Sequence, residues 1–138
     1  MTIVAPGGAA VDADAVPPGL RESTGIVRFD ASLVFVNVAY FESAVLRLVQ
    51  DHPGLRSLVL SFRAINDLDA SGVEMLSALL GEMRKKRVAV TFCGVKPHVR
   101  YVLERTGLAD TIGTDNFFAS EALALQALAA RAPDSSRA

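Results

Sequence analysis

The stretch LVLSFRAINDLDASGVEMLSALLGEMRKKRVAVTFC, residues 58–93, determines the fold class. The runs SLVLSF (57–62) and RVAVTFC (87–93) have strand length and are apolar almost throughout, as expected for strands covered by helices. Residues 70–86 between them predict a helix, because their apolar side chains recur at helical spacing. Those side chains are Val73, Leu76, Leu79, Leu80 and Met83. A strand, a helix and a strand in this order predict a parallel βαβ unit with a right-handed crossover.

The flanking sequence extends this unit into a mixed sheet. Helical spacing of apolar residues predicts three more helices, over residues 39–54, 96–107 and 119–132. Upstream, GIVRF (25–29) and SLVFV (32–36) are separated by two residues, the length of a tight hairpin turn, and predict two antiparallel strands. A short strand near the sequence DTIG is also expected. The fold class is therefore α/β, with a central mixed β-sheet of four to five strands and four to five packed α-helices.

The ends of the chain differ in composition from this unit. Residues 1–23 are rich in Ala, Gly, Pro and Asp and predict a flexible leader or linker, because little in them compensates for the entropy of ordering. Residues 132–138 repeat that composition and predict a flexible tail. The folded domain is predicted over residues 24–131. No uninterrupted apolar run exceeds four residues, so no membrane-spanning helix is expected.

Composition excludes several classes of function. The chain has 138 residues and a net charge of -1, which gives no electrostatic basis for binding nucleic acid. Its single cysteine, Cys93, excludes an internal disulfide and is expected to be a small buried hydrophobic side chain. Its two histidines, His52 and His98, are far apart and form no metal-ligand pattern. We therefore expect no metal and no cofactor.

The junction AINDLDASG, residues 64–72, lies where a strand ends and a helix begins, the usual place for function in α/β folds. One interpretation is capping, in which an Asp or Ser side chain accepts from free amides and Ser71 with Glu74 forms an S-x-x-E capping box. A second is phosphorylation of Ser71, which the positive end of the helix dipole would favour. Gly72 in the first turn indicates a close approach by a partner protein or, more weakly, a nucleotide phosphate.

Residues 25–131 resemble the STAS domain, which anti-sigma-factor antagonists share with the cytoplasmic C-termini of SulP-type anion transporters. The strongest marks are the strand LVLSF, the D-x-S-G motif from Asp69 to Gly72, and the later GVKPHVRYVLERTGL. The resemblance implies a STAS-like fold. It also implies that Ser71 corresponds to the serine that the partner kinase phosphorylates in antagonists.

The SulP branch is favoured because LVFVN is similar to the SulP stretch G-P-L-F-F-A-N, with Leu33, Phe35 and Asn37 in matching positions. This implies a regulatory, protein-interaction domain of a transporter of sulfate or a related anion, at the cytoplasmic face of the cell membrane. The alternative is a stand-alone phosphoswitch of the antagonist type, regulated by phosphorylation of Ser71. An unassigned binding module is a third hypothesis.

The predicted partner-binding residues are Asp67, Asp69, Ser71 and Gly72, with the transmembrane domain of an anion transporter or cytosolic regulatory proteins as partners. Weak nucleotide binding and pairing of the domain with itself are left open. No nucleophile elbow or P-loop is present, so the chain is not expected to be an enzyme. The basic run at residues 84–87 is interpreted either as a solvated helix end or as a contact with anionic lipid headgroups.

Overall fold

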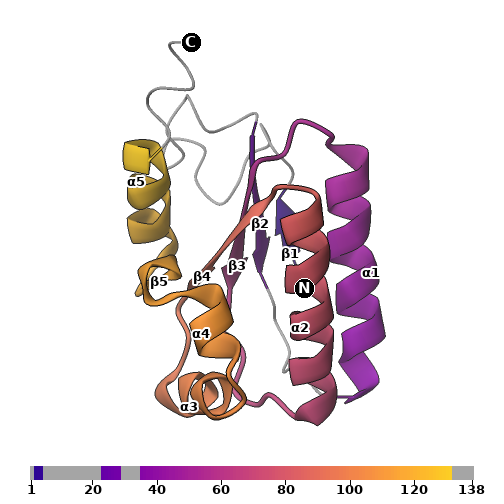
Figure 1. Ribbon diagram of the computed structural model, residues 1–138, viewed down its shortest axis with the longest axis vertical. Helices are drawn as coiled ribbons and strands as arrows, with labels where there is room; N and C mark the ends of the chain where they lie inside the picture. Colours follow the sequence, from indigo (N-terminus) through magenta and orange to yellow (C-terminus); the bar gives the residue numbers. More distant parts are fainter. Residues whose placement is uncertain (1, 5–22, 29–34, 132–138) are drawn as a thin grey trace.

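The computed structural model describes residues 2–4, 23–28 and 35–131 of the chain (Figure 1). In the described part, one five-stranded sheet and five α-helices are present, and the predicted mixed α/β architecture is confirmed. The elements in chain order are β1 (Thr2–Val4), β2 (Thr24–Arg28), α1 (Phe35–Asp51), β3 (Ser57–Ser61), α2 (Ala70–Lys85), β4 (Ala89–Cys93), α3 (Pro97–Arg105), α4 (Leu108–Ile112), a 3-10 turn η3 (Thr114–Asn116), β5 (Phe117–Phe118) and α5 (Glu121–Arg131).

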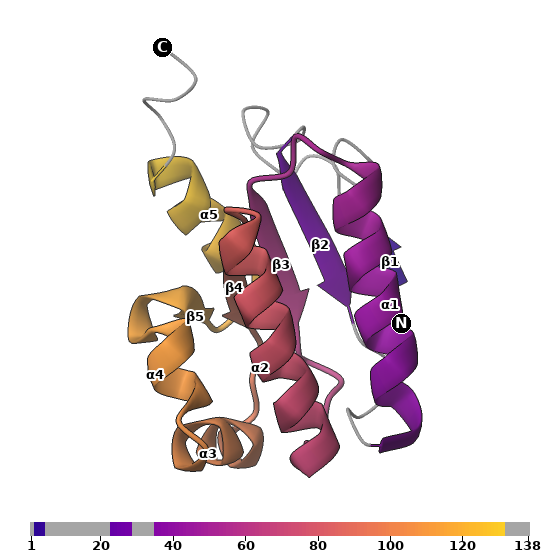
Figure 2. The ribbon, with the colours of Figure 1, turned by 45° about the vertical axis from the view of Figure 1, so that its right-hand side comes forward.

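The strands lie in the order β1-β2-β3-β4-β5, with β1 antiparallel to β2 and the other pairs parallel. Because each parallel strand is added on the same side of the previous one, right-handed crossovers place α1, α2 and the α3–α4 segment on one face of the sheet. The last helix, α5, follows β5 and covers the other face (Figures 1 and 2). The sheet is therefore the middle of three layers.

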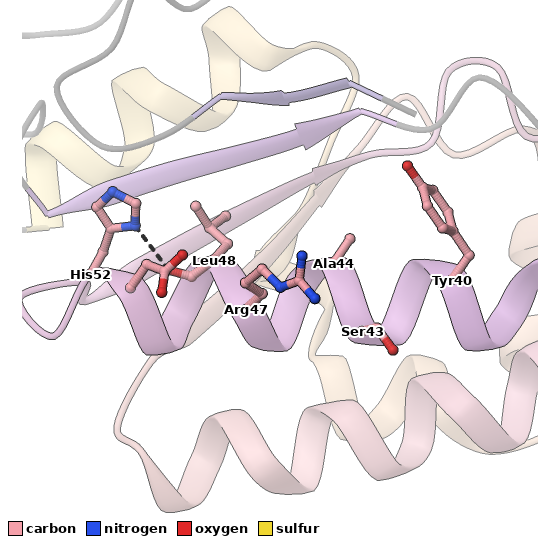
Figure 3. A pocket seen from close by; sticks show the side chains of 7 residues that line it. Tyr40, Ser43, Ala44, Arg47, Leu48 and His52 are labelled. Carbon is pink, nitrogen blue, oxygen red and sulfur yellow. Dashed lines mark hydrogen bonds between the residues drawn. The ribbon is translucent and has the colours of Figure 1, made fainter.

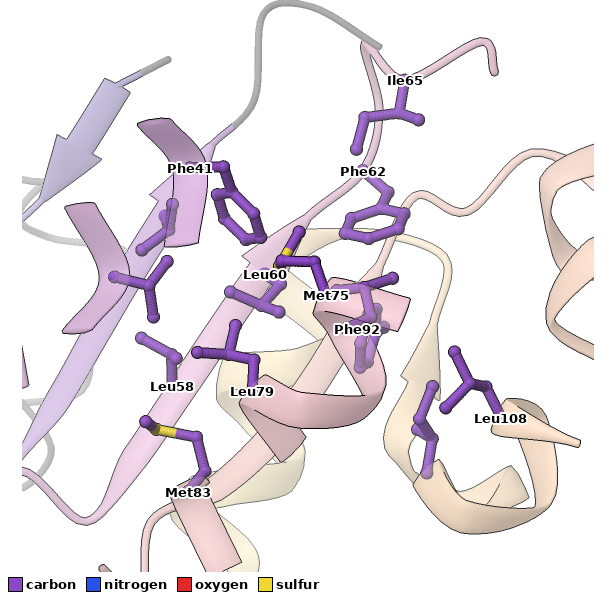
Figure 4. Packing of buried hydrophobic residues seen from close by; sticks show 14 of the residues in the cluster. Phe41, Leu58, Leu60, Phe62, Ile65, Met75, Leu79, Met83, Phe92 and Leu108 are labelled. Carbon is purple, nitrogen blue, oxygen red and sulfur yellow. The ribbon is translucent and has the colours of Figure 1, made fainter. Parts of the chain in front are cut away.

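Alternation of side chains along the strands divides the core in two. Leu58, Leu60 and Phe92 are fully buried beneath α1 and α2 (Figure 4), whereas Val59 and Cys93 face α5. Burial of each such apolar side chain contributes about 1.5–3 kcal/mol. Strands buried on both faces explain why their sequences are apolar without interruption.

The predicted apolar face of α2 is confirmed. Leu76, Leu79 and Met83 are almost completely buried, and Val73 and Leu80 pack against the same cluster while remaining partly exposed. This helix packs against the sheet along its whole length, so its two ends are fixed relative to the strands.

The predicted boundaries of the third helix are also confirmed. Pro97 is the first residue of α3, and Gly107 follows it with a φ of +84°, a left-handed conformation that glycine adopts without strain.

The predicted hairpin is wrong in its second strand. The first four residues of GIVRF belong to β2, but Phe35 and Val36 begin α1, and residues 32–34 lie outside the described part. The strand signal of SLVFV was misleading because Val38 packs on the core in helical register with Phe41, so the helical pattern extends backwards into the apolar run.

The antiparallel neighbour of β2 is instead β1, which lies within the predicted leader and pairs Thr2 with Arg28. Residues 5–22 and 132–138, the rest of the predicted leader and the predicted tail, lie outside the described part.

The short strand expected near DTIG is displaced. Leu108–Ile112 forms α4, whose two terminal residues are both buried four positions apart, as on one side of a helix. The strand follows η3 as β5, and Phe117 and Phe118 pair with the end of β4.

Candidate functional site

The junction between β3 and α2, residues 62–69, lies at the carboxyl edge of the parallel strands, where α/β proteins usually carry their sites (Figures 1 and 2). Phe62, Ile65 and Leu68 are buried, whereas Asp67 and Asp69 are exposed. The ring of Phe62 packs edge-on against Phe92, with centroids 5.0 Å apart. The junction is therefore fixed from below by three apolar anchors and presents its carboxylates outwards.

The loop after β4 and the first turn of α3 hold this junction from the side. Lys96 Nζ donates to the carbonyl oxygen of Arg63, and His98 Nε2 is hydrogen-bonded to the carbonyl oxygen of Asn66. Because a carbonyl only accepts, Nε2 of His98 carries a proton in this contact. The two side chains thereby pair with backbone carbonyls of the connection between the strand and the helix.

Gly94 permits this close approach. Its φ is +70°, and a Cβ on it would lie 3.2 Å from both Cα and N of Arg63. The adjacent backbone bond, from the Phe62 amide to the Cys93 carbonyl, is 2.8 Å long. Any side chain at position 94 would push the two loops apart.

The helix cap is Asp69. Its Oδ1 accepts from the Gly72 amide at 2.9 Å, and its backbone is extended, with φ -96° and ψ -176°. The predicted cap by an Asp is thus confirmed. The capping box between Ser71 and Glu74 is wrong, because Ser71 is already the second residue of α2 and the residue at the third helical position is a glycine.

The four predicted partner-binding residues lie together at this end of α2 but differ in exposure. Asp67 and Asp69 are exposed, Ser71 is partly exposed, and Gly72 is buried. Gly72 therefore packs within this chain, while Asp67, Asp69 and Ser71 are the residues of this group that reach the surface. We call these three residues the junction surface.

Sequence reasoning missed the groups that hold the junction surface in place. His98 is exposed, and it also binds the junction backbone. A basic residue and a histidine on either side of Pro97, where the loop after β4 leads into α3, are the available signal, because the segments after adjacent parallel strands lie side by side.

A second polar contact lies at the same edge on the α5 side. Arg28 donates through Nε and Nη2 to both carboxylate oxygens of Glu121, at 2.8 and 3.2 Å, and ties the end of β2 to the start of α5. Ser120 Oγ accepts from the Leu123 amide at 3.2 Å and caps α5. The ion pair between Arg28 and Glu121 joins residues 93 positions apart, a separation that no local sequence pattern reveals.

Cys93 lies behind this contact and is 1% exposed, which confirms the prediction of a buried thiol. Burial raises the pKa of its thiol to about 11, and the nearby Glu121 carboxylate adds to the effect, while a hydrogen bond with Ser61 opposes it. The thiol is therefore protonated at neutral pH and is not a nucleophile there.

Two hollows lie away from the junction surface. One, of about 350 Å³, follows one side of α1, where Tyr40, Arg47 and His52 line it (Figure 3). The other, of about 200 Å³, lies between α2, β4 and α4 and is lined by Leu80, Arg84, Val88, Ala89, Val90, Thr111, Ile112 and Asn116. Neither hollow includes a residue of the junction surface. Weak nucleotide binding at the junction surface therefore stays a prediction.

Among residues 2–4, 23–28 and 35–131, no three His, Cys, Asp or Glu side chains are grouped so that they could hold a metal ion. No helix in this part of the chain is both long and apolar enough to span a bilayer.

Comparison with known proteins identifies the family. The family model described as the STAS domain matches residues 18–124. The chain belongs to the STAS domain family. The match covers the βαβ unit, the junction surface and most of the remaining described elements, in agreement with the resemblance noted from the sequence.

The similar full-length proteins are sulfate transporters. A probable sulfate transporter of Mycobacterium tuberculosis is 30% identical over 117 residues, which are 83% of this chain and 21% of the transporter. High affinity sulfate transporter 2 of Stylosanthes hamata is 27% identical over 102 residues, 67% of this chain and 15% of that protein. The chain thus spans about a fifth or less of the length of these relatives.

Solved structures of both branches share the fold. The STAS domain of a SulP transporter from Vibrio cholerae has a TM-score of 0.68 and 20% identity, covering 83% of this chain and 86% of that one. The phosphorylated form of the Bacillus cell fate determinant SpoIIAA has a TM-score of 0.60 and 17% identity, covering 78% and 92%. At these identities the structures show a common fold alone.

Proposed function

We propose that the chain acts as a regulatory, protein-interaction domain of a SulP-family transporter of sulfate or a related anion, at the cytoplasmic face of the cell membrane. One observation carries the proposal: a sulfate transporter matches this STAS domain over 83% of the chain, and the match occupies only 21% of the transporter. The remainder of such a protein would supply the transmembrane partner. In this proposal the domain itself catalyses no reaction.

Regulation would act through the junction surface. A partner can contact Asp67, Asp69 and Ser71 more favourably in one transporter conformation than in another. Such a partner shifts the equilibrium between the two conformations, and the equilibrium constant changes tenfold for each 1.4 kcal/mol or so of difference in contact energy. The hydrogen bonds from Lys96 and His98 support this role, because they keep the surface in one shape before binding. A preorganised surface loses less entropy when the partner binds.

Phosphorylation of Ser71 would change the charge of this surface. A phosphoserine adds roughly -1.5 to -2 charges at neutral pH. Asp69 already accepts from the Gly72 amide, so the phosphate would stand beside a carboxylate instead of replacing one. Added negative charge on a surface that already presents Asp67 and Asp69 would repel an acidic partner and attract a basic one.

The second candidate function is a stand-alone phosphoswitch of the anti-sigma-factor antagonist type. Two observations favour it: Ser71 is partly exposed in the first turn of α2, and the fold is shared with SpoIIAA, which has been solved in a phosphorylated form. This function uses the same junction surface, but its partner would be a soluble kinase.

Fractionation of the source cells separates the two. An antibody raised against the 138-residue chain should detect its antigen in the membrane fraction, resistant to a high-salt wash, as part of a polypeptide several times larger than this chain. An antigen confined to the soluble fraction at the size of the chain would overturn the transporter proposal and favour the phosphoswitch.

Mass spectrometry of the protein isolated from the same cells tests the regulatory site. Phosphate is expected on Ser71, and Ser77, an exposed serine of the same helix, is the internal control. A purified Ser71→Asp variant should fold as the unmodified chain does and change partner binding. Phosphate on Ser77 with none on Ser71 would remove the junction surface from the proposed regulation.

A further inference from the structure

A group of cations lies at the amino edge of the sheet, at the opposite end of α2 from the junction surface. We call it the basic end, and its residues are Arg56, Arg84, Lys85, Lys86 and Arg87, all of them exposed. Arg56 precedes β3 and the others end α2. The Ala89 amide donates to the Arg56 carbonyl at 2.9 Å, which holds the two segments side by side (Figure 2).

Within the described part of the chain, the basic end has almost no acidic partners. Lys85 approaches Glu82 at 3.8 Å, and among the described residues the other four cations form no ion pair. These five residues are more than a third of the 14 Lys and Arg in a chain that has 15 Asp and Glu. The remaining 9 Lys and Arg are outnumbered by the 15 Asp and Glu, so the rest of the chain is net acidic.

The backbone conformation of Arg87 gives a second, independent indication that the basic end has a function. Arg87 has a φ of +61°, and it is the one non-glycine residue of the described part in the left-handed region. The Val88 amide donates to the Met83 carbonyl at 2.9 Å, closing the type of helix end at which glycine is the usual residue. The chain thus has a cation where glycine would avoid strain, and such strain commonly marks a functional position.

We propose that the basic end binds the anionic surface of a lipid bilayer. A patch of five exposed cations at one end of an otherwise net acidic molecule fits a flat anionic partner that is approached end-on. Single-stranded nucleic acid fits less well, because proteins that bind it usually also stack its bases on aromatic side chains. The exposed tyrosines, Tyr40 and Tyr101, lie near the start of α1 and in α3, away from the basic end.

This contact goes beyond the proposed function and also orients the domain. The 16 residues of α2 span about 24 Å. With the basic end on the lipid, the junction surface would be held roughly that distance from the bilayer and would face the cytosol. This orientation favours a cytosolic regulatory protein over the transmembrane domain as its partner.

Vesicle sedimentation with the purified chain at physiological salt tests the proposal. The probes are vesicles of phosphatidylcholine alone and of phosphatidylcholine with phosphatidylserine in a two-to-one ratio. Binding is expected only to the second, and Lys85→Gln with Lys86→Gln should weaken it roughly 25-fold, about fivefold for each charge. The matched control is Arg63→Gln with Arg105→Gln, which removes two exposed cations at the opposite edge and should leave binding unchanged.

Arg87→Gly keeps the proposal testable if the double variant folds poorly. It should bind the phosphatidylserine vesicles about fivefold more weakly, yet unfold at a higher temperature because glycine relieves the strained conformation. Three results would overturn the proposal. They are equal binding to both vesicle types, an equal loss in the control variant, and tighter binding of a single-stranded oligonucleotide that depends on Lys85 and Lys86.

Discussion

Replacement of Asp69 tests whether the junction surface and the start of α2 are one structural unit. Asp69→Ala removes the hydrogen bond from the Gly72 amide to Oδ1 and leaves that amide without its side-chain acceptor. Asp69→Asn retains an oxygen that can accept the same bond but removes the negative charge. Ser71→Ala changes only the hydroxyl two residues further on, at a position where the structure has no cap.

The magnitudes follow from the separate contributions of hydrogen bond and charge. Loss of an N-cap acceptor typically costs about 1 kcal/mol, and loss of a negative charge at the helix start costs about 0.5 kcal/mol. Asp69→Ala should therefore lower the free energy of unfolding by about 1.5 kcal/mol, and Asp69→Asn by about 0.5 kcal/mol. Ser71→Ala should be within about 0.5 kcal/mol of the unmodified chain.

Thermal and urea unfolding followed by circular dichroism would measure these differences, with roughly 4 °C in Tm for each kcal/mol in a domain of this size. The order Asp69→Ala, Asp69→Asn, Ser71→Ala, from least to most stable, is the expected result. If Ser71→Ala were as destabilising as Asp69→Ala, Ser71 would be the cap after all. The helix would then begin with the capping box of Ser71 and Glu74, and the cap by Asp69 would be wrong.

Two further predictions concern other groups at the same edge. Gly94→Ala should destabilise the domain by roughly 2 kcal/mol or more, because it strains a φ of +70° and brings a methyl group to 3.2 Å from the Arg63 backbone. Gly81→Ala, within α2 and with nothing within 4 Å, should instead stabilise by about 1 kcal/mol, and equal effects in urea unfolding would refute the close-approach argument. The buried thiol predicts a pH dependence: because folding raises the pKa of Cys93 from 9.0 to about 11, its contribution to stability is complete below pH 9 and is lost between about pH 9 and pH 11. Urea unfolding of the chain and of Cys93→Ala over this range should show the dependence only in the former, and parallel curves would contradict it.

The sequence predicted the elements whose periodicity is set by burial. The βαβ unit at residues 58–93 could be recognised because β3 and β4 are covered on both faces and α2 on one, so hydrophobic pattern and structure agree. The hairpin could not, because SLVFV has the composition of a strand while its end belongs to α1. The antiparallel partner is the distant segment Thr2–Val4, and a pairing across more than 20 residues leaves no local trace.

The sequence predicted where the candidate site lies, but not which residue caps the helix or which side chains hold the junction in place. The D-x-S-G motif located the start of α2, and the choice between Asp69 and Ser71 as the cap depended on a two-residue shift in where the helix begins. The contacts from Lys96 and His98 to junction carbonyls could not be derived, since each joins side chain and backbone more than 30 residues apart.

The structure also bears on how a signal at Ser71 could reach a transporter. The two proposed contact regions lie at opposite ends of α2, and between them Leu76, Leu79 and Met83 are packed with at most 2% exposure. A close-packed helix of this kind cannot slide or rotate without opening cavities, which cost several kcal/mol, more than the 1–3 kcal/mol of a typical allosteric coupling. We therefore expect the domain to move as one body. A phosphate or a partner at the junction surface would act by adding or removing contacts there, while the proposed lipid contact of the basic end would set where that surface lies relative to the membrane.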